Sequence, residues 1–336
     1  MRKLKFFLAG MLLAICAAVG SGIRLPASAQ GTQYYLGGMT AGFSLSANGV
    51  EVVAFKEVAS EAGGGCPAAQ AGMKTGDLIV AVDGIHTRTI GDLSAALARS
   101  DGNTARFLIK RGGETVQMDI LPLKDAKDGK YKIGILIRDT LSGIGTVTYI
   151  EKESGRFGSL GHAVCDESKA SLALADASVY CCSIVGVTRG ERGRAGELKG
   201  LLLNDSPIAG ADKVCETGLY GTFCDEYDLS DVPTVEAAPL SQATIGKAVI
   251  YSTVDGITPR EYEIAIAKVD AGNKNNKNFV IKVTDEALLR ETGGIVQGMS
   301  GSPIVQNGKL IGAVTHVFLN DPTRGYGIGI EKMLGN

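Results

Sequence analysis

The stretch GGIVQGMSGSPIVQNGKLIGAVTHV, from Gly293 to Val317, places Ser300 in a glycine-rich turn in front of two short apolar runs. The runs, Ile304-Val305 and Leu310–Val314, are joined by a turn that contains Asn-Gly. Asn-Gly between apolar runs is the strongest short-range signal for a tight β-hairpin. The stretch therefore predicts a pair of strands with one serine presented where the pair begins.

The glycines around Ser300 predict a catalytic role for its hydroxyl. A serine that only fills a core needs no glycine on either side, whereas Gly298 and Gly301 enclose this one. Gly298 permits a backbone conformation in which the N–H groups of Gly298 and Ser300 both point at a developing oxyanion. One such donor contributes about 3–4 kcal/mol to catalysis where it has been measured. We therefore expect Ser300 as nucleophile, with Gly298 and Ser300 forming the oxyanion hole.

A serine nucleophile requires a general base, and the chain has only three histidines. His162 lies in the segment GRFGSLGHAVCD, which is rich in glycine on the N-terminal side of the histidine. It is the preferred base. An imidazole in this role is worth about 10²- to 10⁴-fold in rate. His316, on the strand after the hairpin, is the alternative base, although a place in the wall of the substrate cleft suits it better. His86 is expected to be a solvated loop residue.

The seven cysteines are irregularly spaced and include no C-x-x-C pair. Buried free thiols or a disulfide are therefore favoured over a zinc site, and no metal or cofactor is expected. Cys165 has neither a glycine setting nor oxyanion donors, so a buried thiol is a better interpretation than a nucleophile. The residues considered for zinc are His162, Cys165, Cys181, Cys182, Cys215 and Cys224.

Residues 66–123 alternate turn signals with short apolar runs and one helical stripe over Ile90–Arg99. The segment AGMKTGDLIVAVDG, residues 71–84, resembles the signature of bacterial PDZ domains, which are α+β. Upstream, Tyr34–Leu45 resembles the glycine loop and strand with which PDZ domains bind a peptide. The resemblance implies an N-terminal PDZ domain over residues 31–123. Its expected peptide-binding residues are Gly38, Ala41, Gly42 and Phe43.

After a polar linker at Lys124–Gly134, the chain shows many short apolar runs broken by turn residues, which indicates one or two β-barrels. The segment around Ser300 is similar to the nucleophile segment of chymotrypsin-like proteases, with Met299 and Ser302 where trypsin-like enzymes have Asp and Gly. Together with FGSLGHAV and the PDZ segment, it resembles the stage IV sporulation protein B peptidases. We thus expect a mainly β protein in which residues 124–336 form a chymotrypsin-like double β-barrel.

The family resemblance implies a triad of His162, Asp285 and Ser300, in the order of the chymotrypsin template. From the residues alone, Asp285 is at least as well explained as the N-cap of a helical turn that starts near Ala287. Asp321 is the second candidate acid, although Asp-Pro predicts a turn there.

The N-terminus has a short basic segment, an apolar run over Phe6–Val19 and a small-residue site at Ala27-Ser28-Ala29. This layout predicts that residues 1–29 are a secretory signal peptide or, uncleaved, a signal anchor over residues 6–22. Residues 1–29 carry four bases and no acids, so the formal charge of −2 becomes −2 − 4 = −6 without them. Such a charge gives no indication of a nucleic-acid partner.

The resemblance implies an exported serine endopeptidase of sporulation in the space between mother cell and forespore. Its partners would be a membrane-associated regulator of an intramembrane protease, which processes a late sigma factor, and the enzyme itself through autoproteolysis. The alternative is a catalytically inactive PDZ adaptor at the forespore membrane. The two differ in whether Ser300 and His162 are needed for function.

Overall fold

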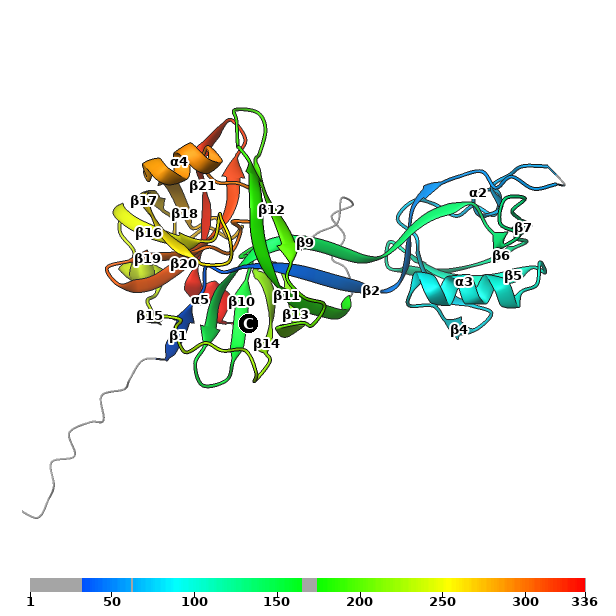
Figure 1. Ribbon diagram of the computed structural model, residues 1–336, viewed down its shortest axis with the longest axis horizontal. Helices are drawn as coiled ribbons and strands as arrows, with labels where there is room; N and C mark the ends of the chain where they lie inside the picture. Colours follow the sequence, from blue (N-terminus) through cyan, green and yellow to red (C-terminus); the bar gives the residue numbers. More distant parts are fainter. Residues whose placement is uncertain (1–31, 62, 165–173, 336) are drawn as a thin grey trace, which may run out of the picture.

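The computed structural model describes residues 32–61, 63–164 and 174–335, which form a larger lobe and a smaller lobe joined by two long strands (Figure 1). Strands dominate both lobes. In the described part of the chain, no helix is long and apolar enough to cross a membrane. The expected signal segment, residues 1–29, lies outside the described residues.

The first barrel of the larger lobe is a closed ring of six antiparallel strands. Around the ring the order is β9 (Ile135–Glu151), β10 (Arg156–Ser159), β14 (Gly218–Phe223), β13 (Ala209–Cys215), β11 (Leu174–Thr188) and β2 (Thr40–Phe55), which returns to β9. Phe43, Val147, Phe157, Val179 and Leu219 fill its interior. The alternation of these apolar residues with polar ones along each strand is what a half-buried strand requires.

The second barrel is also a closed ring of six strands. Its order is β16 (Gly246–Ser252), β17 (Arg260–Val269), β18 (Phe279–Val283), β21 (Asp321–Gly329), β20 (Lys309–Phe318) and β19 (Pro303–Gln306), which pairs again with β16. The expected Asn-Gly hairpin joins β19 to β20, with φ of 52° at Asn307 and 74° at Gly308. Two such barrels in sequence confirm the predicted chymotrypsin-like architecture.

Short elements tie the two barrels together. Strand β1 (Gln33–Leu36) pairs with β9 and with β15 (Thr234–Ala237), and β15 runs parallel to β20 of the second barrel. Strand β12 (Glu197–Leu202) extends β11 as a hairpin. The remaining elements of this lobe are η1 (Leu240–Gln242), α4 (Glu286–Thr292) and α5 (Ile330–Leu334).

The smaller lobe has the PDZ fold that the sequence predicts. Its elements are α2 (Pro67–Gln70), β3 (Leu78–Val82), β4 (Ile85–His86), α3 (Ile90–Arg99), β5 (Ala105–Arg111), β6 (Glu114–Ile120), β7 (Leu123–Lys124) and β8 (Tyr131–Lys132). Helix α3 begins with a capping box between Thr89 and Asp92 and buries Leu93, Ala96 and Leu97. The predicted helical stripe over Ile90–Arg99 is thus confirmed.

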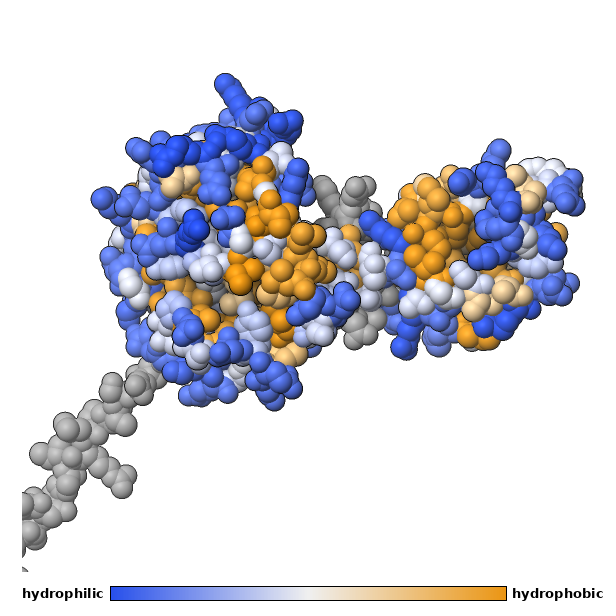
Figure 2. All heavy atoms as spheres, in the orientation of Figure 1, coloured by the Kyte–Doolittle hydropathy of each residue, from blue (hydrophilic) through white to orange (hydrophobic). Residues whose placement is uncertain are grey.

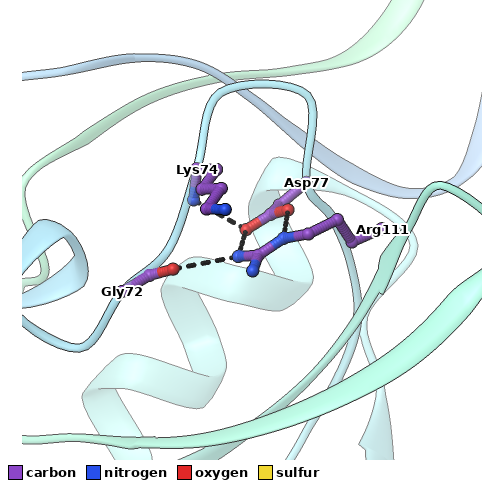
Figure 3. Close-up of polar contacts among 4 residues, drawn as sticks. All are labelled: Gly72, Lys74, Asp77 and Arg111. Atoms are coloured by element: carbon purple, nitrogen blue, oxygen red, sulfur yellow. Dashed lines mark hydrogen bonds and ion pairs between the residues drawn. The ribbon is translucent and has the colours of Figure 1, made fainter.

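An ion pair explains the glycine and acid of the AGMKTGD segment (Figure 3). Arg111 donates two hydrogen bonds of 2.6 Å to the carboxylate of Asp77, and a third, of 2.9 Å, to the carbonyl of Gly72. The backbone N–H of Lys74 donates to the same carboxylate at 2.7 Å. Because the Asp77 side chain is only 1% exposed, these donors replace the water that it loses on folding.

Strands β2 and β9 pass through both lobes as an antiparallel pair, so the PDZ lobe is an insertion in the peptidase domain. The predicted boundaries, 31–123 and 124–336, therefore need correction. Residues 33–46 pair with strands of the first barrel, whereas β8 and the first residues of β9 belong to the smaller lobe. The expected linker at Lys124–Gly134 is part of that lobe.

Candidate active site

Ser300 lies in a tight turn between α4 and β19. Within the second barrel, the N–H of Met299 donates to the carbonyl of Val296 at 3.1 Å, and that of Gly301 donates to Val314 at 2.8 Å. The Met299 side chain is fully buried in the core of this barrel. The turn that presents Ser300 is therefore held by hydrogen bonds from the residues immediately before and after it.

The first barrel supports the same turn through strand β9. The backbone N–H of Thr146 donates to the carbonyl of Ser300 at 2.9 Å, and the Thr146 hydroxyl donates to the carbonyl of Gly298 at 2.8 Å. The hydroxyl of Thr148 donates to the carbonyl of Gly301 at 2.7 Å. A Cβ at Gly301 would lie 2.0 Å from the Thr146 carbonyl oxygen, so only glycine allows this approach.

Two backbone amides beside the serine are available for an oxyanion. Gly298 has φ of +98°, which side chains other than glycine rarely adopt. Neither the N–H of Gly298 nor that of Ser300 donates a hydrogen bond to a residue in the described ranges. The oxyanion hole stays a prediction, and this geometry favours it.

His162 follows β10 of the first barrel and is half-buried. Its Nδ1 lies 2.8 Å from the carbonyl oxygen of Ala163, which can only accept, so Nδ1 carries the proton. The other nitrogen, Nε2, is then an unprotonated base. Burial lowers the pKa of His162 and keeps the ring neutral at neutral pH.

The serine and both imidazoles meet where the two barrels adjoin. The Ser300 hydroxyl donates to the carbonyl of Thr315 at 2.9 Å, and Thr315 precedes His316. The centroids of the His316 and His162 rings are 5.1 Å apart. Ser300 is thus connected to His162 through Thr315 and His316, and the roles of nucleophile and base stay predictions. In this state the hydroxyl is bonded to a carbonyl, so it must turn toward an imidazole before it can react.

Asp285 is the N-cap of α4, and its expected triad role needs correction. Its carboxylate accepts from the N–H of Leu288 at 2.9 Å and from that of Glu263 at 3.4 Å. Within the described ranges, the influences on the pKa of His162 are burial and the Ala163 carbonyl, and Asp285 is not among them. The second candidate acid, Asp321, accepts from the hydroxyl and N–H of its neighbour Thr323, as a turn residue does.

The expected peptide-binding residues of the PDZ domain lie in the larger lobe, which contradicts that assignment. Over residues 41–43, strand β2 pairs with β11 on one side and with β9 on the other, so it has no edge to offer a peptide. At Gly38, with φ of +101°, a Cβ would lie 2.8 Å from that of Tyr251. Glycine is needed there because two barrels pack closely. The four residues concerned are Gly38, Ala41, Gly42 and Phe43.

The groove of the smaller lobe lies instead between α3 and the start of β9, with a volume of about 640 Å³. Figure 2 shows the apolar area on this lobe. Over Ile135–Arg138, β9 pairs with β2 on one side only, as far as the described strands show, so its other edge faces the groove. The sequence signal is the apolar run KIGILI, residues 132–137, whose first three residues fall in the expected linker at Lys124–Gly134. The apolar lining includes Leu93, Leu97, Ile133, Ile135 and Ile137.

The cysteines offer little chemistry within the described ranges. Cys66, Cys181, Cys182 and Cys224 are free thiols, and burial raises the pKa of Cys182. In residues 32–61, 63–164 and 174–335 there is no group of three or more His, Cys, Asp or Glu side chains that could hold a metal. Cys165 lies outside these ranges.

Comparison with known families agrees with this geometry. The model of the SpoIVB peptidase S55 family matches residues 129–334, more than half of the chain, and a PDZ family model matches residues 58–111. The chain belongs to the SpoIVB peptidase S55 family. The chain therefore combines a region of this peptidase family with a PDZ region, as the motifs around Ser300 and in residues 71–84 predicted.

Other proteins resemble this SpoIVB peptidase over shorter stretches. A protein of Brucella suis biovar 1, named as a zinc metalloprotease, is 31% identical over 104 residues, which are 30% of this chain and 27% of that protein. A similarly named protein of Lactococcus lactis is 33% identical over 72 residues, or 21% of this chain and 16% of that protein. The chain thus spans about a quarter or less of these curated relatives.

Solved structures give similarities to each lobe. The PDZ domain of an SdrC-like protein from Listeria monocytogenes is 27% identical, with 27% of this chain and 90% of that one covered and a TM-score of 0.23. The inactive form of the Rv3671c protease of M. tuberculosis is 16% identical, with 57% and 81% covered and a TM-score of 0.33. The HtrA-type protease AlgW with tripeptide is 14% identical, with 58% and 54% covered and a TM-score of 0.34.

Proposed function

We propose that this SpoIVB peptidase is a serine endopeptidase in which Ser300 is the nucleophile and His162 the general base. The proposal is supported by the position of Ser300, which bonds the Thr315 carbonyl next to His316, whose ring lies 5.1 Å from that of His162. Two backbone amides beside Ser300 have no partner among the described residues. The carbonyl of Ala163 would take the place of the triad acid, because it accepts the Nδ1 proton and leaves Nε2 as the base.

The reaction follows from these positions. The Ser300 hydroxyl turns from the Thr315 carbonyl toward Nε2 of His162, which removes its proton as the oxygen attacks the substrate carbonyl. The carbonyl oxygen becomes negative and accepts hydrogen bonds from the N–H groups of Gly298 and Ser300. His162 then gives its proton to the leaving amine, and water, activated by the same imidazole, releases the acyl group from the serine.

A fluorophosphonate probe tests the catalytic proposal, because it reacts only with an activated serine. We expect labelling of the wild type, none of Ser300→Ala, and a loss of at least about 100-fold in labelling rate for His162→Ala. His316→Ala is the matched control and should keep most of the labelling. Equal labelling of the wild type and Ser300→Ala would overturn the proposal, and loss only in His316→Ala would move the base to His316.

The groove between α3 and β9 supports peptide binding by the PDZ lobe. A bound segment would add a strand to the unpaired edge of β9 and place apolar side chains against Leu97 and Ile135. The test uses a fluorescently labelled peptide with the sequence of the chain's own N-terminal segment or of a target protein. The variant Leu97→Glu should bind this peptide more weakly than the wild type. Leu121→Glu, at a leucine that is 57% exposed and outside the groove, is its control.

For the cellular role, we propose an exported enzyme, cleaved from or anchored by residues 6–22, that acts in the space between mother cell and forespore. Its substrates would be a membrane-associated regulator of an intramembrane protease and its own N-terminal region. Mapping of N-termini by mass spectrometry after incubation should reveal self-cleavage in the wild type and none in Ser300→Ala.

Genetic complementation separates this role from that of an inactive adaptor. Under the proposal, Ser300→Ala fails to restore sporulation to a strain that lacks the gene, and Leu97→Glu impairs it. Restoration by Ser300→Ala but not by Leu97→Glu would instead favour the adaptor.

A further inference from the structure

A strip of two neighbouring aromatic rings and two cations lies beside His316, on β20, β21 and the loop that precedes β18. The rings of Phe318 and Tyr326 have centroids 4.6 Å apart. The Lys277 ammonium lies 4.8 Å above the centroid of Tyr326, and the Arg324 guanidinium 5.6 Å from that of Phe318. We call these four residues the cationic strip. Lys277 is also close enough to His316 to contribute to the lowering of its pKa.

Neither cation of the strip forms an ion pair with another residue that the structure describes. Among the ion pairs of the described chain, none involves Lys277 or Arg324, although both side chains are half-buried. Lys282 lies opposite Arg324 in the β18–β21 pairing and adds to the positive charge. The nearby Asp321 carboxylate accepts its hydrogen bonds from the N–H and hydroxyl of Thr323. Unpaired cations at a partly dehydrated site favour an anionic ligand, and they stand out in a chain of net charge −2.

The loop that carries Lys277 is fixed in place. The Lys332 ammonium donates to the carbonyl of Asn273 at 2.7 Å, and the Asn276 amide donates to the carbonyl of Glu216, in the first barrel, at 3.3 Å. The N–H of Lys277 itself donates to the Asn273 side chain at 3.1 Å. The backbone that carries the Lys277 side chain is therefore fixed before any ligand binds, which lowers the conformational entropy lost on binding.

The strip follows the site of reaction along one strand. The Thr315 carbonyl holds the Ser300 hydroxyl, and His316 and Phe318 come directly after it on β20. Over residues 316–318 this strand pairs with β21 on one side, and no other described strand pairs with its second edge. A substrate that adds to this edge would carry the side chains on the N-terminal side of the scissile bond across His316 toward the strip.

We propose that the cationic strip is a substrate subsite that selects an acidic side chain, Asp or Glu, on the N-terminal side of the scissile bond. This inference rests on the proposed peptidase function and names the class of substrate sequence for the same site. The carboxylate forms an ion pair with Lys277 and Arg324, while its methylene groups pack on the rings of Tyr326 and Phe318.

Peptide sets that differ at one position test the subsite. Each of the four positions N-terminal to the scissile residue carries Glu, Gln or Lys in turn, in an otherwise neutral peptide. We expect one position at which Glu exceeds Gln by on the order of 10-fold in kcat/KM, since a charge-assisted contact is worth that much. Lys277→Glu should reverse the order in favour of Lys, and Arg324→Glu should weaken the preference. Lys274→Glu, an exposed lysine of the same loop, should leave it unchanged.

Binding to Ser300→Ala separates this inference from the proposed reaction. Dissociation constants of the same labelled peptides are measured at low salt and in 1 M NaCl, where the Debye length is about 3 Å. A Glu preference that is lost in high salt and in Lys277→Glu supports the subsite even if no peptide is cleaved. Equal affinity for Glu and Gln peptides at all four positions, or a preference that Lys277→Glu leaves intact, would overturn it. Absent fluorophosphonate labelling, by contrast, counts against the reaction alone.

Discussion

Thr146 of the first barrel donates its hydroxyl proton to the carbonyl of Gly298, in the nucleophile turn of the second barrel, at 2.8 Å. Both residues are buried, so water cannot replace this bond. The bond orients the peptide unit that precedes Met299 and, with it, the turn that presents Ser300. The geometry of the nucleophile therefore depends on a strand that belongs to the other barrel.

Thr146→Val removes that hydroxyl and keeps the shape of the side chain. We expect a loss of about 1–3 kcal/mol in the free energy of unfolding, because the Gly298 carbonyl is left without its partner. Peptidase activity should fall further than stability alone explains, and the measurement is kcat/KM beside urea unfolding. Thr222→Val, on an exposed threonine of β14, is the control. Unchanged activity in Thr146→Val would show that the turn is fixed without β9.

The pH dependence of activity identifies the base. Burial lowers the pKa of His162 below its ordinary value of 6.5, so its imidazole stays unprotonated through neutral pH. We expect kcat/KM to be flat near pH 7 and to decline only below pH 6.5, as protonation removes the base. His316→Gln should leave this acid limb nearly in place, because burial is the main cause of the lowered pKa of His162. Loss of the limb in His316→Gln would identify His316 as the group that titrates.

His316 also links stability to pH. Burial, then the neighbouring His162 and Lys277, lower the pKa of His316 to about 4, against about 6.5 in the unfolded chain. The folded protein therefore binds fewer protons between these values, and the stability contributed by neutral His316 is full above pH 6.5 and declines toward pH 4. The melting temperature of the wild type should fall more over this interval than that of His316→Gln. Parallel declines in the two proteins would contradict this assignment.

Substitutions of Asp285 distinguish a helix cap from a triad acid. Ser and Asn are both good N-caps, so Asp285→Ser and Asp285→Asn should keep most of the stability and activity. Asp285→Ala should lose about 0.5–2 kcal/mol in the free energy of unfolding. If Asp285 were the orienting acid, Asp285→Asn would instead lose activity by orders of magnitude while its unfolding curve stayed near that of the wild type.

The ion pair in the PDZ lobe is expected to be necessary for its folding. Arg111→Met leaves the buried Asp77 carboxylate without its main partner, which costs roughly 3–5 kcal/mol. The unfolding transition of this lobe should therefore move to lower temperature in calorimetry. The double variant Asp77→Leu with Arg111→Met should recover part of the loss, because no unpaired charge remains buried. A wild-type transition in Arg111→Met would refute the role of the pair.

Local signals in the sequence were enough to predict the fold, and they also singled out Ser300 and His162, whose catalytic roles stay predictions. Asn307-Gly308 determines the β19–β20 hairpin, and the glycines around Ser300 determine the turn in front of it. With three histidines in the chain, the choice of base had few alternatives, and the His162 ring does lie 5.1 Å from that of His316, the residue after the Thr315 that bonds Ser300. The local structure that such short-range patterns favour is retained in the folded protein because tertiary contacts stabilise the same structure.

Signals that depend on distant contacts were misjudged. The glycines at 37, 38 and 42 suggested a ligand loop, whereas packing between barrels is the reason for Gly38, and no local pattern reveals a neighbour such as Tyr251. Asp285 satisfies both a triad order and an N-cap position, and only the contacts to Leu288 and Glu263 decide between them. The run Ile133–Ile137 predicts a strand, but not that this strand lines the groove of the smaller lobe, because β9 is 17 residues long and serves two lobes.

The insertion of the PDZ lobe decides how the enzyme can be dissected. Cutting the chain after residue 123 would discard β1 and the barrel half of β2, and so open the ring of strands that supports Thr146. Removal of residues 48–139, with a short Gly-Ser bridge between the two stumps, would instead preserve the printed pairings of β2 with β11 and with the barrel half of β9. A lobe attached through two adjacent strands is also unable to swing on a single tether, so a peptide bound in its groove would approach the larger lobe from a restricted range of directions.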